Sequence, residues 1–466
     1  MIVSLDIIMD NMTDIDDVVT TQRGAPSIVF QGFTFRKDKT DEKGELSFWR
    51  CRHKGCPGRL VADAGMKKAR LTKPHEGHFP KANVAQAAKI VTKVRERVVN
   101  EKGPVNRIYR EETRAVADDT ETLQLLPTFA TMKSGLYKSR KEKFGPVPAR
   151  LAEFVVPEKL QRLDNGESFL LFQSDDNKIV VFGTEKDFAT VCTTDELFVD
   201  GTFEAVPRFF TQLFTIHTFN GEKQFPRLYC FLENKTAEIY TNLIDALKNL
   251  AQNKGLEFSP KKITSDFESG WISAVHESLQ TTSINGCFFH FTQAVVRKIN
   301  SMGLMKKFLE NEPFRNIVRE VIGLAFLPTN KVMQTLGEIT ETSPDEETSK
   351  FLEYFMGQWV IRVQPQLWNV RGRVHRTNND LESWHNRLNL DVGKAKNVFF
   401  IIQCLINDHL DAVVLERQME SGEAISLGKK KDEAKNNAIK RLERDLEAGA
   451  KSEKEFCRAV GSLMVK

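Results

Sequence analysis

The pattern of apolar and polar positions differs between two parts of the chain. Between residues 28 and 80, short aromatic and β-branched runs such as IVFQGFTFRKD and ELSFWRCRH are interrupted by Gly, Asp and Lys. Such runs predict the strands of a small sheet. From about residue 165, apolar runs alternate with segments of helical periodicity, which predicts an α/β domain. The fold class that we expect is therefore multidomain, with a small β-rich domain ahead of an α/β body.

The order of elements in the α/β body follows from the same pattern. Residues 236–255, TAEIYTNLIDALKNLAQNKG, space their apolar residues as on a helix that Gly255 closes. Residues 304–361 have mostly helical periodicity, whereas 395–417 predict a buried helix and 428–449 a charged, exposed one. Strands are expected at 168–174, 178–184, 196–206, 210–219, 225–233, 261–268 and 283–289, and a helix follows each of the last two.

Charge is distributed unevenly between these parts. Residues 1–22 carry five Asp and no Lys or Arg, and residues 23–150 carry 28 Lys and Arg against 14 Asp and Glu. The remaining 316 residues carry 39 against 44, so the net charge of +4 hides a basic N-terminal block. Such a block is typical of a nucleic-acid-binding module, although a basic surface without a partner accounts for the charge equally well.

The sequence also argues against some classes of protein. No apolar run reaches 18 residues, and the apolar N-terminal segment lacks a basic region before it, so we expect neither a membrane span nor a signal peptide. The seven cysteines are scattered without a disulfide framework, which favours a reducing interior. Residues 82–99 predict a helix with mostly basic charges, and 104–150 predict one or two helices and a linker.

Cysteine and histidine pairs occur at a spacing that zinc sites use. Cys51 and Cys56 have four residues between them, and His75 and His78 follow after an 18-residue spacer. Zinc takes four nitrogen or sulfur ligands in a tetrahedron, and two close pairs can supply them. A structural zinc would also stabilise a sheet that is small for independent folding. His53 lies in the Cys loop, so the identity of the ligands stays open, and two unrelated pairs remain the alternative.

The residues around these pairs resemble a FLYWCH-type zinc finger. That family carries a Phe, a Leu-aromatic-Trp run, two Cys and two His, whose places are filled by Phe35, Leu46, Phe48, Trp49, Cys51, Cys56, His75 and His78. Phe48 replaces the usual Tyr, and two residues rather than one separate the histidines. The resemblance implies one structural Zn²⁺ and a small sheet that presents basic residues to DNA. The candidate phosphate contacts are Arg50, Arg52, Lys54, Arg59, Lys67, Lys68 and Arg70.

Two aspartates lie in or next to apolar strands of the α/β body. Asp200 follows Phe198 and Val199 in ELFVDGTFEAV, where a charge is costly unless it is paired or bound to a cation. Asp266 lies at the carboxyl end of the strand in KKITSDFE, where open α/β sheets bind ligands. A helix N-cap remains the alternative role for Asp266, and an ion pair with Lys or Arg the alternative for Asp200.

The segment RTNNDLESWHNRLN, residues 376–389, predicts a helix with two distinct faces. One face carries Leu381, Trp384 and Leu388, which we expect to pack on the core. A solvated opposite face would normally hold Lys and Glu pairs, whereas this one holds one acid among amides and a histidine, which suits orientation of a ligand or a hydrated metal. The residues of the polar face are Asn378, Asn379, Glu382, His385, Asn386 and Asn389.

Asp200, Asp266 and Glu382 together suit a site for two divalent cations. Mg²⁺ prefers a few carboxylates and keeps waters, and Mn²⁺ is the alternative ion. Two such ions, roughly 4 Å apart, clamp the attacking and leaving oxygens of a phosphodiester in line. That chemistry requires no nucleophilic side chain.

The same residues resemble a Mutator-like element (MULE) transposase. LFVDGTF, ITSDFE, GCFFH and TNNDLESWHNRL occur in the order of that family. Asp200, Asp266 and Glu382 match its D–D–E triad at separations of 66 and 116 residues. The resemblance implies a ribonuclease H-like catalytic domain with a helical insertion between the second Asp and the Glu. Cys287 and His290 match the family's Cys-x-x-His element.

Several roles stay open at this point. Cys287 and His290 either belong to the packing of a strand and a helix or shape the active site or a DNA-end contact. Trp384 is either a core residue, which is favoured, or a residue that stacks on a flipped base. His385 could orient Glu382 or touch a phosphate. The residues that we assign to active-site support are Cys287, His290, Asn378, Asn379 and His385.

These features predict a nuclear DNA transposase that cleaves the ends of its element and joins them to target DNA. Its partners would be double-stranded DNA, both terminal inverted repeats and target, and other copies of itself as a homo-oligomer on DNA, with no membrane. The alternatives are a domesticated DNA-binding transcription regulator without transposition and a metal-dependent nuclease without strand transfer. The expected domains are an acidic flexible tail (1–27), a zinc finger (28–80), a basic helical region (81–164), a ribonuclease H-like core (165–303), a helical insertion (304–375), the completion of the core (376–420) and a charged helical tail (421–466).

Overall fold

The computed structural model describes residues 11–20, 25–101, 103–143, 147–221, 223–373, 375–376, 379–393, 397–421 and 429–465. The chain forms two compact units, which are treated separately below. The first comprises Met1–Val147 with Leu390–Lys394, and the second comprises Pro148–Asn389 with Ala395–Lys466.

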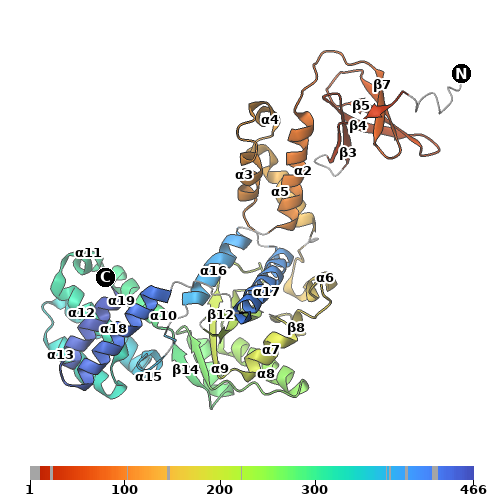
Figure 1. The fold of residues 1–466 in the computed structure, drawn as a ribbon. Coiled ribbons are helices and arrows are strands. Elements are labelled where there is room, and N and C mark those ends of the chain that lie inside the picture. The colour runs from red at the N-terminus through yellow and green to blue at the C-terminus, as the bar shows by residue number, and fades with distance from the viewer. Residues whose placement is uncertain are drawn as a thin grey trace. The chain divides into compact units, whose positions relative to one another are not determined.

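The first unit begins with a seven-stranded antiparallel sheet in the order β1-β7-β6-β5-β4-β3-β2 (Figure 1). Phe35, Trp49 and Leu60 are buried together in its core. Residues 13–20 fall in the expected flexible tail but form strands instead, because Val18 and its neighbours pair with β3. The strands are β1 Thr13–Asp14, β2 Asp17–Thr20, β3 Pro26–Phe30, β4 Phe33–Thr40, β5 Leu46–Cys51, β6 Arg59–Asp63 and β7 Lys68–Lys73.

Helices complete the first unit. Val98, Ile108 and Leu136 come from three of them and share one apolar core. The buried guanidinium of Arg140 donates to Val98 O at 2.7 Å and to Gly103 O at 2.9 Å, which satisfies one carbonyl in the last turn of α2 and one that follows the helix. The helix expected at 82–99 is present, and three helices rather than one or two follow it. The helices are α2 Val84–Asn100, α3 Val105–Arg114, α4 Thr120–Leu125 and α5 Phe129–Lys143.

The second unit contains a seven-stranded mixed sheet in the order β14-β13-β10-β11-β12-β9-β8. β10, β13 and β14 run parallel, whereas β10, β11, β12, β9 and β8 pair antiparallel. The sequence pattern missed α7, which begins with a capping box between Thr184 and Asp187. The strands are β8 Leu170–Gln173, β9 Ile179–Phe182, β10 Glu196–Thr202, β11 Gln212–Asn220, β12 Lys223–Leu232, β13 Lys262–Ser265 and β14 Ser283–Gly286.

Helices cover both faces of this second sheet (Figure 1). On one face, Leu243 of α8 and Trp271 of α9 pack in a single core with Val199 of the sheet. On the other face, Trp384 of α16 contacts Tyr229 of β12. The helices are α7 Glu185–Thr193, α8 Ala237–Asn253, α9 Ser269–Ser278, α16 Asn379–Val392 and α17 Val398–Glu420, and two short ones, η1 Leu151–Glu153 and α6 Glu158–Gln161, precede the sheet.

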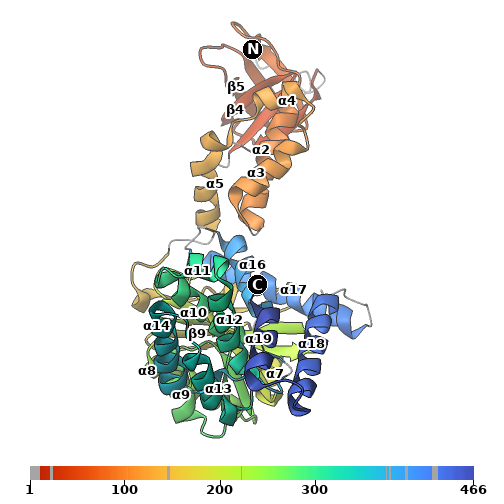
Figure 2. The same cartoon turned by 90° about the vertical axis from the view of Figure 1, so that its left-hand side faces the viewer.

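The remaining helices form a separate core that includes the C-terminal helices (Figure 2). Phe456 and Val460 of α19 are fully buried there, so α19 is not the exposed tail that its charged surroundings predicted. A Cβ atom on Gly323 would lie 2.1 Å from Cys457 O, so the backbones of α12 and α19 touch and only glycine fits. The elements are α10 Phe288–Ser301, α11 Met305–Glu310, α12 Glu312–Gly323, η2 Leu324–Phe326, α13 Thr329–Glu341, α14 Glu346–Phe355, the π-helix η3 Met356–Arg362, α15 Pro365–Trp368, α18 Lys429–Glu447 and α19 Glu453–Met464.

Helix α17 is, by length and composition, apolar enough to cross a membrane. Its polar residues are nevertheless bonded inside the fold. Asp408 accepts a hydrogen bond from Tyr229 Oη at 3.0 Å, and Glu416 pairs with the buried Arg227 of β12. These contacts identify α17 as a core helix, as its sequence predicted.

Candidate functional site

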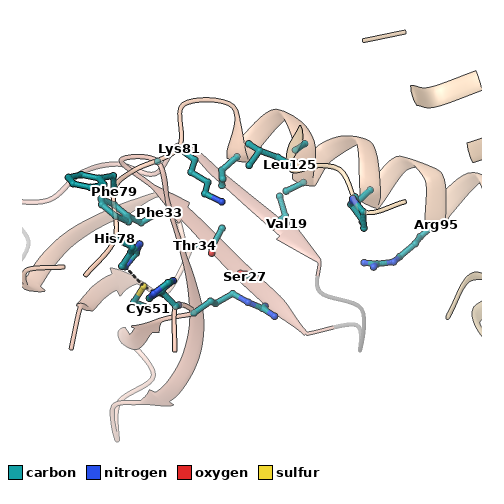
Figure 3. Close-up of a pocket in the computed structure, with 18 residues that line it drawn as sticks. Val19, Ser27, Phe33, Thr34, Cys51, His78, Phe79, Lys81, Arg95 and Leu125 are labelled. Atoms are coloured by element: carbon teal, nitrogen blue, oxygen red, sulfur yellow. Dashed lines mark hydrogen bonds between the residues drawn. The ribbon is translucent and has the colours of Figure 1, made fainter. Parts of the chain in front are cut away.

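The four zinc-ligand candidates converge in the first unit. The Cys51 Sγ–His78 Nε2 and Cys56 Sγ–His75 Nδ1 distances are both 3.4 Å, and the two histidine nitrogens are 3.3 Å apart. Zinc bonds of about 2.3 Å to sulfur and 2.0–2.1 Å to nitrogen place neighbouring tetrahedral ligands about 3.3–3.6 Å apart. The observed distances therefore fit one Zn²⁺. Figure 3 shows His78 directed at Cys51, with Phe33 beside it.

The local chain stabilises this arrangement. The backbone N–H groups of His53 and Gly58 donate to the sulfurs of Cys51 and Cys56 at 3.4 and 3.3 Å. Such bonds favour the thiolate, and the pKa of Cys56 is lowered, whereas burial raises the pKa of Cys51. Burial lowers the pKa of His75, which keeps the ring neutral as a zinc ligand requires. His53 stacks on the ring of His78 and stands outside the group of four, which resolves the ambiguity that the sequence left.

The candidate DNA contacts fall into two sets. Arg50 and Arg59 lie directly opposite each other on β5 and β6, and the same row continues to Arg36 on β4 and Lys73 on β7. Like charges that face each other across strands are destabilising, so this row of four cations suits an anionic ligand. Asp38 pairs with Arg50 and offsets part of the charge.

The other candidates lie outside this row. Arg52 and Lys54 follow β5, Lys67 precedes β7, and Lys68 and Arg70 belong to β7. Sequence reasoning missed the other two members of the row, because strand register sets which distant residues face each other.

The second candidate site brings together segments from distant parts of the chain. Asp200 lies in β10 and Asp266 directly follows the neighbouring parallel strand β13, each two residues beyond the pair Phe198–Thr264. His290 of α10 places Nε2 at 2.8 Å from Oε1 of Glu382 on α16.

A ligand atom from each of Asp200, His290 and Glu382 lies within 4.8 Å of the other two. Asp266 lies outside that group of three, but its charge acts on Asp200.

The electrostatics of this site reflect crowded acids. Burial raises the pKa of Asp200, and the charges of Asp266 and Glu382 raise it further. Burial also raises the pKa of Asp266. Burial disfavours protonated His290, but hydrogen bonds with Cys287 and Glu382 outweigh burial and raise its pKa. The hydrogen bond from His290 in turn lowers the pKa of Glu382. A cationic imidazole thus offsets part of the negative charge.

The two aspartates are held by a chain of polar contacts. The backbone N–H of Gly201 donates to Asp200 Oδ1 at 2.9 Å, and the buried Gln212 fills the space that a side chain at Gly201 would need. Gln212 donates to Tyr240 Oη at 2.6 Å, and Tyr240 donates to Glu268 at 2.9 Å.

The N–H of Glu268 donates to Asp266 Oδ1 at 3.2 Å. Asp266 therefore accepts a hydrogen bond at the start of α9, but Glu268 is the N-cap residue. The chain of contacts links the positions of the two acids.

Helix α16 is anchored through the face that the sequence assigned to the core. Leu381, Trp384 and Leu388 are buried. Trp384 Nε1 donates to Asp408 Oδ2 at 2.7 Å, and Arg387 donates to Asp408 Oδ1 at 2.6 Å. Trp384 is thus a core residue and is not exposed for base stacking.

The polar face of α16 behaves only partly as expected. His385 is 5 % exposed, with Nδ1 at 3.6 Å from Asp200 Oδ2, and burial lowers its pKa to about 4. It therefore sits as a neutral ring against Asp200 rather than on a solvated stripe, whereas Asn386 is exposed. Asn378 and the side chain of Asn379 lie outside the described residues. In the part of the chain that the structure describes, no Lys or Arg forms an ion pair with Asp200.

The donor sets suit two different ions. The first is two thiolates and two imidazoles, the ligands of structural zinc. The second offers carboxylate oxygens at a half-buried site, which Mg²⁺ and Mn²⁺ prefer.

Comparison with known families finds one match in each unit. Residues 18–78 match the FLYWCH zinc finger domain, and residues 196–294 match the MULE transposase domain. None of the curated proteins matches the chain. The two matches confirm both resemblances, support structural zinc in the first unit, and indicate a transposase or a DNA-binding protein derived from one.

Proposed function

We propose that this chain is a DNA transposase of the Mutator-like class with a D–D–E active site. The observation that carries the proposal is the convergence of Asp200, His290 and Glu382, with Asp266 directly after the adjacent strand, in a chain that contains a MULE transposase domain. The acids come from residues 66 and 116 positions apart, and a purely structural role would not require them to gather at one half-buried place.

The sheet topology supports a ribonuclease H-like fold. Three successive antiparallel strands, β10, β11 and β12, are followed by β13 and β14, which add in parallel on the other side of β10. Asp200 then lies on the central first strand and Asp266 after the fourth. The helices from α11 to α15 separate Asp266 from Glu382 along the chain, which is the position of the proposed insertion.

The proposed reaction is hydrolysis of a phosphodiester at the element end, followed by attack of the freed 3′-hydroxyl on target DNA. Asp200, Asp266 and Glu382 would hold two Mg²⁺ ions, which when bound clamp the attacking and leaving oxygens in line. Gly201 and Glu268 orient the two aspartates through their backbone N–H groups. His290 keeps Glu382 aligned through its 2.8 Å contact, and Trp384 fixes the helix that carries Glu382.

The zinc finger would hold the element end. The row formed by Arg36, Arg50, Arg59 and Lys73 offers phosphate contacts across four strands. Such contacts supply affinity that falls steeply with salt. Oligomerisation on DNA and a nuclear location are part of the proposal by resemblance alone.

A domesticated DNA-binding regulator is the second candidate, because the zinc finger and its cationic row suffice for that role. The retained acids favour the transposase, since a protein without catalysis has no need to bury crowded carboxylates, which are costly. Terminal inverted repeats flanking the gene would favour a mobile element, and their absence would favour domestication. A labelled 3′ end, joined or not joined to target DNA, would separate a transposase from a simple nuclease.

The test is cleavage of a labelled duplex that carries a candidate element end. Asp200→Asn, Asp266→Asn and Glu382→Gln should each reduce Mg²⁺-dependent cleavage on the order of 10³-fold while DNA binding through the finger persists. Asp195→Asn is the matched control, because Asp195 is exposed and pairs with Lys261. Normal cleavage by any of the three variants, or cleavage that survives chelation of Mg²⁺, would refute the shared metal site.

A further inference from the structure

The side chains of Phe203 and Lys235 form an exposed surface beside the acid site, here called the lip. Phe203 follows β10 and is 48 % exposed. Lys235 lies between β12 and α8, and its Nζ is 3.6 Å from the centre of the Phe203 ring. A large exposed aromatic side chain with a cation on its face is a common surface for binding planar, anionic ligands.

The lip lies beside residues that bond to the two catalytic aspartates. The Phe203 ring is 3.8 Å from where a Cβ on Gly201 would lie, and Gly201 bonds to Asp200. Lys235 Nζ is 3.4 Å from Oε2 of Glu268, whose backbone N–H bonds to Asp266. The lip therefore contacts the residue that follows Asp200 and the residue two positions after Asp266.

The lysine is held by a rigid loop. A Cβ on Gly270 would lie 2.6 Å from Lys235 O, so α9 packs directly on the backbone of this loop. Asn234 Oδ1 accepts from the N–H and the hydroxyl of Thr236 at 3.0 and 2.8 Å. The backbone of Lys235 is thus fixed before any ligand arrives, which lowers the entropic cost of binding.

We propose that Phe203 and Lys235 form the subsite for the nucleotide that flanks the scissile phosphate. This inference rests on the proposed function. Crowded carboxylates repel a DNA strand, and Lys235 supplies a positive charge at the entrance, where Nζ can bind a non-bridging phosphate oxygen. The exposed surface of Phe203 stacks on the adjoining base, a contact that tolerates any sequence.

The experiment uses the full chain and the same labelled duplex. Phe203→Leu and Lys235→Gln should each raise KM for the duplex about tenfold and leave the Mg²⁺ concentration for half-maximal cleavage unchanged. The matched controls are Leu309→Ala, which alters another exposed apolar residue, and Lys178→Gln, which alters another exposed lysine paired with an acid. Both controls should cleave as the unaltered chain does.

An abasic nucleotide gives a sharper readout. Placed next to the scissile phosphate, it should raise KM for the unaltered chain but add little to the effect of Phe203→Leu, because the stacking partner is already lost. Full additivity would overturn the stacking assignment. Unchanged KM in both lip variants, with Asp200→Asn inactive, would overturn the lip while the proposed function stands.

A second measurement does not require cleavage. With Ca²⁺ in place of Mg²⁺, a duplex that carries 5-iodouracil beside the scissile phosphate should photocrosslink to the peptide that contains Phe203. Absence of that crosslink while other peptides of the catalytic unit react would overturn the proposal. If the unaltered chain crosslinks at Phe203 but never cleaves, Phe203 contacts DNA, but the proposed function fails and the assignment to a scissile phosphate fails with it.

Discussion

The zinc cluster and the acid site are both convergences of ligand atoms, but they are built in opposite ways. The four zinc ligands come from a 28-residue window, residues 51–78, and their atoms already stand at tetrahedral distances. The acids come from residues 200, 266 and 382, and burial raises the pKa of two of them. One site is arranged to be filled permanently. The other holds groups that disfavour one another until cations or protons arrive.

The difference indicates what each site contributes. Metal binding at the first cluster is folding free energy, because a sheet of this size has a small core. Removing negative charge from the acid site should relieve the repulsion between its carboxylates. Its residues therefore contribute to the reaction at the expense of stability. Substitutions in the two sites should therefore change stability in opposite directions.

The largest expected effect follows from loss of a zinc ligand. Cys56→Ala should abolish zinc binding and unfold the sheet of the first unit, since structural zinc contributes about 10 kcal/mol or more in small domains. Zinc content and limited proteolysis of residues 13–78 would measure this. Cys192→Ala, which removes a half-buried thiol of α7, is the control. If the sheet of the variant stayed folded and protease-resistant without zinc, the claim that the zinc site stabilises the first unit would be contradicted.

Next in size is the anchor of the helix that carries Glu382. Trp384→Phe loses the 2.7 Å bond to Asp408, which should cost about 1.5–3 kcal/mol and lower cleavage about 10- to 100-fold. Trp271→Phe is matched, because Trp271 is also buried but its Nε1 has no hydrogen-bond partner among the described residues. Equal cleavage by the two variants would show that the anchor does not position the acid.

A smaller effect of opposite sign is expected at the acid site. Asp266→Asn should raise the stability of the metal-free protein by about 1 kcal/mol while cleavage is lost. The pKa of Asp266 is higher in the folded protein than in the unfolded chain, so Asp266 of the unfolded chain loses its proton at a lower pH. The stability of the metal-free protein therefore falls as pH rises from about 4 to the pKa that Asp266 has in the folded protein. Urea unfolding in chelator, repeated across this range, should show a shallower pH dependence for the variant. If the Asp266→Asn variant were less stable than the unaltered chain, the acids would not destabilise the metal-free protein by repulsion.

The smallest effect is expected on the finger. Arg36→Gln removes one cation from the cross-strand row, so stability should rise by about 0.2–1 kcal/mol. DNA affinity should fall, and the slope of the logarithm of the DNA-binding constant against the logarithm of salt concentration should decrease in magnitude by about one. Lys67→Gln removes the same charge from a turn outside the row. Equal losses of DNA affinity in both variants would show that the row has no special role.

How far the sequence predicts these sites depends on the distance between their parts. The zinc ligands were predictable from spacing, because two close pairs in one small sheet have few ways to meet. Asp200 was predictable as an acid inside an apolar strand and Asp266 as an acid at the end of one. The positions of His290 and His385 were not, because each depends on how a helix packs on a sheet formed by other segments. The capping box of α7 was readable at Thr184 and Asp187, but the short helix was overlooked between strong strand patterns.

The C-terminal helices show the same limit. The charge of α18 predicts exposure, yet α19 closes the core of the helices that precede Glu382. The contact depends on Gly323 and Gly461, where only the lack of a side chain lets two backbones touch. No local pattern connects glycines that lie more than a hundred residues apart.

Anomalous diffraction from crystals of the full chain bound to an element end and Mn²⁺ would test the central claim most directly. The account predicts manganese peaks within coordination distance of carboxylate oxygens of Asp200, Asp266 and Glu382, and no manganese at the Cys51 cluster. Manganese absent from those three carboxylates, or bound to fewer than two of them with DNA in place, would contradict it.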